Sequence, residues 1–228
     1  MPAVASPGTL SRSVLADQVK DRLLSDILAG RYAPDARIVE TQVARELGTS
    51  QAPVREALRG LEALGVVEIT PFRGARVRRP TRAELLEAYA VRSALESLGA
   101  HLAVPRMDDA DLAELAGYVD AMQAAARADD GHAVAEADAR FHGRIVELAA
   151  NGTLEKVWRS LEPFSRTYIT LVVPGADPKW SADLHVPILA ALRQRDAEAV
   201  VTALERHFAE ISTNMARRLP AGTDERDA

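Results

Sequence analysis

Apolar residues in the first third of the chain follow a helical spacing up to about residue 64 and a strand-like spacing after it. Apolar positions three and four apart predict helices, and short apolar runs separated by a turn sequence predict strands. The predicted elements are helices over Val14–Gly30, Glu40–Leu47 and Thr49–Leu64 and strands over Val66–Ile69 and Ala75–Val77. Residues 31–37, which include Pro34, are expected to form a loop. This order of elements is that of a winged helix-turn-helix.

The remainder of the chain has a helical pattern throughout. A capping box, Thr81-Arg82-Ala83-Glu84, marks its start. Six helices are predicted, over Arg82–Ala103, Asp108–Ala128, Gly131–Ala150, Thr153–Tyr168, Ser181–Arg193 and Asp196–Leu219. Pro187 falls inside the fifth and is expected to kink it or delay its start. The expected fold class is mainly α: a winged helix-turn-helix domain over residues 12–79, then an all-α six-helix bundle over residues 80–219. Residues 1–11 are expected to be a flexible leader and residues 220–228 a frayed tail.

Composition excludes several classes of protein. The 228 residues are 47% hydrophobic and include no run of 18 apolar residues that could span a bilayer, so no membrane partner is expected. The absence of cysteine excludes a disulfide scaffold and a thiol nucleophile, and a cytoplasmic protein is expected.

The net charge of -5 conceals an asymmetry, because residues 1–82 hold 13 Lys and Arg against 9 Asp and Glu. Only this first part is suited to approach phosphates.

The second helix of the predicted pair has the pattern of a DNA-reading helix. Its apolar residues Val54, Leu58 and Leu61 line one face, and Gln51, Arg55 and Arg59 form a stripe on the other. Arginine suits phosphates or guanine edges, and glutamine suits adenine. The N-terminal Ser50 and the hairpin tip, Arg73-Gly74, are further candidates for contacts with the backbone and the minor groove. The alternative is that Arg55 and Arg59 are solvated charges with Glu56 and Glu62 as partners.

One segment of this predicted helix resembles the central signature of the GntR family of bacterial transcription regulators. It is Ser50-Gln51-Ala52-Pro53-Val54-Arg55-Glu56-Ala57-Leu58-Arg59-Gly60-Leu61-Glu62. The preceding residues 40–48 are similar to the family as well. The resemblance implies a homodimer that binds double-stranded DNA at a palindromic operator. It also implies DNA-contacting positions at Thr41, Ser50, Gln51, Pro53, Arg55, Arg59 and Gly74.

Three histidines and one aspartate in the helical part are candidate metal ligands. Asp138 and His142 lie four residues apart on one predicted helix, so they share a face. His185 and His207 fall on two other helices, and facing helices can direct such side chains into one bundle interior. Imidazole and carboxylate together suit zinc, nickel, manganese or iron. The alternative is a surface Asp–His pair with separately hydrogen-bonded histidines.

Several motifs of the helical part resemble the FCD ligand-binding domain of the FadR subfamily, in its shorter VanR-like branch. They are Tyr89-x-x-Arg92-x-x-x-Glu96, Asp138-x-x-Phe141-His142 and Arg206-His207. The resemblance implies a divalent metal at Asp138, His142, His185 and His207, with zinc favoured and nickel or manganese as alternatives. It also implies a small carboxylate effector, for which Arg92 is the expected partner; the alternative for Arg92 is a salt bridge to Glu96. His101 and His132 are expected at the surface, and Trp158, Trp180 and Tyr168 in packing roles.

The sequence therefore predicts a transcription repressor, not an enzyme, whose operator binding is modulated by an organic acid held at a metal. Two alternatives stay open. In one the metal is itself the signal, and chelation alone would change operator binding. In the other the metal activates water in a hydrolase or isomerase, which would turn over a substrate without DNA.

Overall fold

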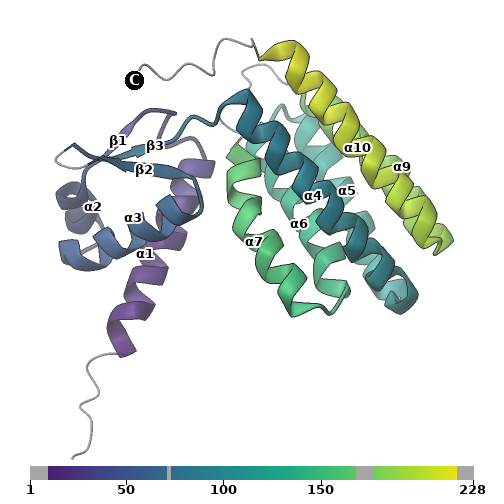
Figure 1. The fold of residues 1–228 in the computed structure, drawn as a ribbon, viewed down its shortest axis with the longest axis horizontal. Coiled ribbons are helices and arrows are strands. Elements are labelled where there is room, and N and C mark those ends of the chain that lie inside the picture. The colour runs from purple at the N-terminus through teal and green to yellow at the C-terminus, as the bar shows by residue number, and fades with distance from the viewer. Residues whose placement is uncertain (1–9, 71–72, 168–176, 220–228) are drawn as a thin grey trace, which may run out of the picture. The chain divides into compact units, whose positions relative to one another are not determined.

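The structure is a computed structural model that describes residues 10–70, 73–167 and 177–219 (Figure 1). The chain divides into two compact units, residues 1–79 and 80–228. Most of the predicted leader, the predicted tail and Tyr168 lie outside the described residues. No helix in the described part of the chain is long and apolar enough to cross a membrane.

The N-terminal unit is a winged helix-turn-helix, as predicted. Its elements are α1 (Leu10–Leu28), β1 (Arg37–Ile38), α2 (Glu40–Glu46), α3 (Gln51–Ala63), β2 (Val67–Thr70) and β3 (Gly74–Val77). Helix α3 packs on α1 through buried Val54, Leu58 and Leu61, at the i, i+4, i+7 spacing of one helix face. Burial of these residues leaves the opposite face of α3 exposed.

The sheet has one strand that the sequence pattern did not predict. Its order is β1-β3-β2 with both pairings antiparallel, and β1 pairs Ile38 with Ala75. Residues 31–37 were expected to be loop throughout, and a two-residue strand is too short to show an alternating pattern. Gly74, at the start of β3, has a φ of 83°, a conformation that glycine adopts without strain.

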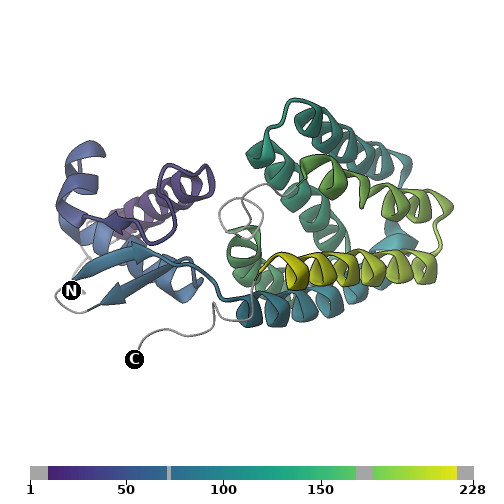
Figure 2. The same cartoon turned by 90° about the horizontal axis from the view of Figure 1, so that it is seen from above.

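The C-terminal unit is the expected all-helical domain. Its elements are α4 (Arg82–Ala103), η1 (Val104–Arg106), α5 (Asp109–Arg127), α6 (Gly131–Leu148), α7 (Gly152–Thr167), α8 (Pro178–Asp183), α9 (Val186–Gln194) and α10 (Ala197–Arg218). Helices α4 and α10 run side by side, and α6 packs on α4 (Figure 2). The core between the helices contains Leu85, Phe141, Ile145, Ile188 and Leu204, all fully buried.

The fifth predicted helix is two helices, which corrects the expected six-helix bundle. Helix α8 ends at Asp183 and α9 begins at Val186, so the described part of the domain holds one more α-helix than predicted. Pro187 lies in the first turn of α9, where a missing backbone N–H leaves no hydrogen bond unmade. Of the two effects predicted for Pro187, the kink is absent, and the delayed start agrees with α9, which begins at Val186.

The capping box at the start of α4 is present and gives a stability prediction. The Thr81 hydroxyl accepts from the Glu84 backbone N–H at 3.2 Å, and the Glu84 carboxylate accepts from the Thr81 N–H at 2.9 Å. Thr81→Ala is expected to lower the free energy of unfolding by about 0.5–2 kcal/mol, because N-terminal N–H groups lose an acceptor. Thermal and urea unfolding measure this loss. Thr213→Ala is the control, since this exposed hydroxyl only bonds back to Ala209 within α10; equal effects of the two substitutions would contradict the capping role.

Candidate metal centre and nucleic-acid interface

The four predicted metal ligands lie together inside the C-terminal unit. Asp138 and His142 are on α6, His185 is the residue before α9, and His207 is on α10. All four are buried, and one ligand atom from each lies within 4.8 Å of the others. The alternative of a surface Asp–His pair is wrong for this site, because Asp138 and His142 face the interior.

Three of the ligand atoms converge closely. Nε2 of His142 lies 3.1 Å from Nε2 of His185. Oδ1 of Asp138 lies 3.0 Å from Nε2 of His185 and 3.8 Å from Nε2 of His142. Two imidazole nitrogens at this separation either share a proton or together face a cation.

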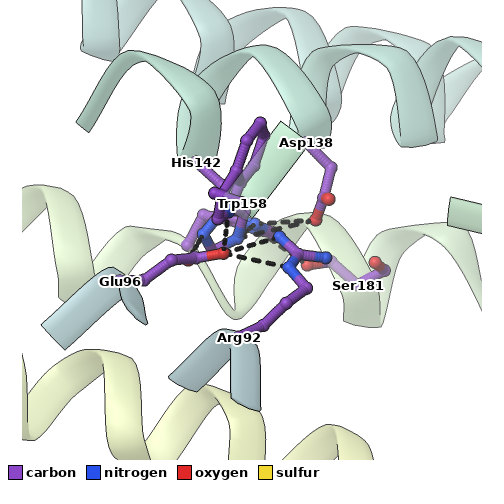
Figure 3. Close-up of polar contacts among 7 residues, drawn as sticks. Arg92, Glu96, Asp138, His142, Trp158 and Ser181 are labelled. Carbon is purple, nitrogen blue, oxygen red and sulfur yellow. Dashed lines mark hydrogen bonds and ion pairs between the residues drawn. The ribbon is translucent and has the colours of Figure 1, made fainter. Parts of the chain in front are cut away.

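The outer nitrogens of these two rings are already engaged. Nδ1 of His185 donates to the carbonyl oxygen of Ser181 at 3.0 Å, and Nδ1 of His142 donates to Oε2 of Glu96 at 2.5 Å (Figure 3). A carbonyl and a carboxylate only accept hydrogen bonds, so both Nδ1 atoms carry hydrogen. When each ring is neutral, its Nε2 atom therefore directs a lone pair into the cluster, which is the arrangement of metal-binding histidines.

The break between α8 and α9 makes this contact of His185 possible. In a continuous helix the Ser181 carbonyl would accept from the backbone N–H of His185. That N–H bonds instead to the carbonyl of Ala182. The Ser181 carbonyl is thereby left for the imidazole ring.

The surroundings of two of the four candidate ligands, Asp138 and His207, favour the protonation state that binds a metal. Burial alone would raise the pKa of Asp138, but without a metal a hydrogen bond from a protonated Nε2 of His185, and the charges of protonated His142 and of Arg92, lower it well below its usual value. Burial, together with the charges of His185 and His142, lowers the pKa of His207 well below its usual value. An ionised carboxylate and a neutral imidazole are the forms that bind a metal.

The donor set fits a divalent transition metal. Nδ1 of His207 is buried and has no hydrogen-bond partner among the described residues, an arrangement that is costly unless another group occupies the site. Three imidazoles and one carboxylate are the donors that zinc, nickel and manganese accept. A cavity of about 240 Å³, lined by Trp180, Leu184, Arg206 and His207 among others, adjoins the cluster.

Arg92 makes the salt bridge that was one of its two expected roles. Its side chain is buried, and Nη2 lies 2.8 Å from Oε1 of Glu96. The guanidinium carbon lies 5.5–5.8 Å from the ring centres of Tyr89, Trp158 and Phe208. Burial would raise the pKa of Glu96, but the charges of His142 and Arg92 outweigh it and lower the pKa to about 2. The pair thus stays ionised beside the cluster.

Sequence reasoning missed the contact of Glu96 with His142 and the role of the Ser181 carbonyl. The spacing of Arg92 and Glu96 indicated their pairing, whereas the approach of α4 to α6 has no signal in the sequence. Trp158 packs in the core as expected, and its Nε1 also donates to Glu96 at 2.7 Å. His132 is exposed, and Nδ1 of His101 lies 3.8 Å from Oε1 of Glu198 at the surface.

The exposed face of α3 carries the predicted DNA-reading stripe. Gln51, Arg55 and Arg59 are exposed, as are Thr41, Ser50 and Arg73, and Gly74 is half-buried. Pro53 differs from these residues because it is buried in the first turn of α3, where it shapes the helix start. A DNA contact at this residue stays a prediction.

Arg55 pairs with an acidic residue other than Glu56 or Glu62, the two that the sequence suggested for Arg55 and Arg59. Nη2 of Arg55 lies 3.0 Å from Oε2 of Glu40, at the start of α2. Glu62 accepts instead from the backbone N–H of Ile69 at 3.0 Å. Arg55 is therefore aligned by a residue from the neighbouring helix of the helix-turn-helix.

Comparison with known proteins identifies the family. Residues 15–77 match the model of bacterial regulatory proteins of the gntR family, and residues 87–210 match the FCD domain. The chain is 35% identical over 205 residues to the "Probable D-xylose utilization operon transcriptional repressor" of Paenarthrobacter nicotinovorans, covering 90% of each chain. The chain belongs to the GntR family. It is a DNA-binding transcriptional regulator with an FCD domain, and the matched families and relatives are regulators and not enzymes.

This GntR regulator is also similar to a less closely related repressor and to a solved structure. It is 26% identical to the HTH-type transcriptional repressor RspR of Escherichia coli strain K12, over 87% of each chain. The solved structure of E. coli McbR/YncC has the same fold, with a TM-score of 0.74 and 24% identity, covering 89% of this chain and 97% of the other.

Substitution of one candidate ligand tests the metal centre. His207→Ala is expected to weaken Zn²⁺ binding by more than the ~10–100-fold that loss of a supporting residue costs, because one of four donors is removed. Competition with a chromogenic chelator measures the affinity. His132→Ala, an exposed histidine outside the cluster, is the matched control. Equal affinity of the two variants would show that His207 is not a ligand.

Proposed function

We propose that this GntR regulator is a homodimeric repressor whose binding to a palindromic operator is controlled by a small organic acid held at a metal in the FCD domain. The observation that carries the proposal is the buried cluster of Asp138, His142, His185 and His207 in a chain that also has a DNA-binding domain. Two relatives support the sign of regulation and the carbohydrate or acid character of the signal: the probable D-xylose utilization operon repressor, and the gluconate operon transcriptional repressor of Bacillus subtilis strain 168, which is 23% identical over 208 residues.

In the N-terminal unit, the exposed stripe of α3 enters the major groove in this proposal. Arg55 and Arg59 contact phosphates or guanine edges, Gln51 a base edge, and Thr41 and Ser50 the backbone. Arg73 and Gly74 at the hairpin tip reach the minor groove. Glu40 holds the guanidinium of Arg55 at 3.0 Å, so part of the entropy of ordering this side chain is lost before DNA binds.

In the C-terminal unit, the four ligands hold the divalent ion, for which zinc is the favoured identity. The ion, when bound, would supply positive charge for a carboxylate, whose oxygen would join the four protein ligands as a further ligand. Arg92 supplies a second cation within the same buried region, and its guanidinium can match a carboxylate in geometry. The aromatic rings around Arg92 exclude water and strengthen such a charge pair.

Control of DNA binding requires that the effector bind two states of the protein with different affinity. The free energy of effector binding is then linked to the free energy of operator binding, and each ligand changes the affinity for the other by the same factor. An acid that binds both states equally would leave repression unchanged. The proposal thus requires a measurable change in operator affinity at saturating effector.

Arginine substitutions on α3 test the DNA-binding part. Arg55→Ala and Arg59→Ala are each expected to weaken operator binding by about 5- to 150-fold, because a base-contacting or phosphate-contacting cation is lost. Fluorescence anisotropy with a duplex selected from random sequences measures the affinity at a fixed salt concentration. Arg127→Ala, an exposed arginine at the end of α5, is the control. Unchanged affinity of both α3 variants would exclude α3 as the reading helix.

A thermal-shift screen of small organic acids, with and without a chelator, tests the effector site. An acid at 100 times its dissociation constant is expected to add about 2.7 kcal/mol to the free energy of unfolding. For a chain of this size, that is a rise of roughly 2–4 °C per kcal/mol. The rise should vanish with chelator. A fall in melting temperature with chelator and no response to any acid would instead identify the metal as structural or as the signal.

A further inference from the structure

The carboxylate of Glu96 lies at the centre of a buried hydrogen-bond network beside the metal ligand His142 (Figure 3). Its Oε2 lies 2.5 Å from Nδ1 of His142, and its Oε1 accepts from Nε1 of Trp158 at 2.7 Å. Oε1 also lies 3.0 Å from Nε and 2.8 Å from Nη2 of Arg92. The side chains of Glu96 and His142 are each 1% exposed, so bulk water hardly competes for these bonds.

The chemistry of imidazole gives this carboxylate a specific effect on His142. A neutral imidazole carries hydrogen on one ring nitrogen and a lone pair on the other, and only the lone pair binds a metal. Since a carboxylate accepts and does not donate, Glu96 keeps the hydrogen on Nδ1 and leaves Nε2 free toward Asp138 and His185. The negative charge at Nδ1 also makes Nε2 a stronger ligand.

Arg92 and Trp158 in turn keep Glu96 ionised and oriented. Both bond to Oε1, which leaves Oε2 for the imidazole. A buried carboxylate without such partners would be unstable, because its desolvation would be uncompensated. The three side chains thus form one unit that comes from two helices, α4 and α7, and acts on a third, α6.

Gly143 supports this assignment independently. A Cβ at this position would lie 3.1 Å from Cη2 and 3.3 Å from Cζ3 of Trp158. A methyl group there would require the indole to move by a few tenths of an ångström. Glycine inside a helix is unfavourable relative to alanine. Its presence within α6 lets the indole lie against that helix with Nε1 directed at Glu96.

We propose that Glu96 is a positioning residue of the metal centre, which fixes His142 in the ring orientation and tautomer that bind a divalent ion and is itself held by Arg92 and Trp158. The inference rests on the proposed metal binding by the cluster. It goes beyond that proposal by giving a function in metal affinity to residues that are not ligands.

The test uses Co²⁺ as the probe metal and the full-length protein, with affinity and coordination followed by visible absorption. Glu96→Gln is expected to weaken binding by ~10–100-fold and to change the absorption spectrum. The amide can present either its oxygen or its NH₂ group to Nδ1, so the tautomer of His142 is no longer fixed. Trp158→Phe, which removes the Nε1 donor and keeps an aromatic ring, is expected to cause a smaller loss.

A pair of glycine substitutions provides a matched control. Gly143→Ala is expected to weaken Co²⁺ binding by displacing Trp158, although it adds only a methyl group. Gly117→Ala on α5 should leave the affinity unchanged, because a Cβ there meets no atom within 4 Å. Equal Co²⁺ affinities of these two variants would contradict the displacement of Trp158.

The outcomes separate this inference from the proposed function. Failure of the wild-type protein to bind Co²⁺ would overturn the proposed metal centre itself. Binding by the wild type with the same affinity and spectrum in Glu96→Gln would overturn only the positioning role, even if the melting temperature of the metal-free protein fell. If Glu96→Gln does not fold, unchanged Co²⁺ affinity in Trp158→Phe overturns the positioning role.

Discussion

The close approach of two imidazole nitrogens, Nε2 of His142 and Nε2 of His185, is the constraint around which the C-terminal domain is arranged. Both rings have their Nδ1 atoms committed to acceptors, so the two lone pairs require a proton or a cation between them. Burying such polar groups is costly unless every one has a partner. The surrounding helices supply those partners in succession: a carboxylate from α6, another from α4 and a free carbonyl from the end of α8.

This arrangement connects the interior of the FCD domain to the biology of a GntR regulator. A DNA-binding domain alone is always active, and regulation requires a second site whose occupancy changes the equilibrium between two states. A charged, buried cluster next to a small cavity is suited to such a site, because charge–charge interactions are strong where water is excluded. In the proposed function, the exposed arginine stripe of α3 is the other site. Its contacts with DNA would then be salt-dependent, and they are the property that the effector would modulate.

Much of this organisation could be predicted from the sequence because it is local. Helical periodicity predicted α3 and its exposed stripe, and the i, i+4 spacing of Asp138 and His142 predicted a shared face. Features that depend on contacts between distant segments could not be predicted. Strand β1 exists only through its pairing with β3, and Glu96 reaches His142 only because α4 packs on α6. The ion pair of Arg55 with Glu40 depends likewise on the angle between two helices.

The most direct test of this account is an anomalous-diffraction map of crystals of the purified protein, grown without added metal. Data on either side of the zinc absorption edge would identify the ion and its position. The account predicts a single strong peak per chain in the C-terminal domain, bonded to Asp138, His142, His185 and His207 at about 2.0–2.2 Å. A map without a peak at these residues, from protein never exposed to a chelator, would contradict it.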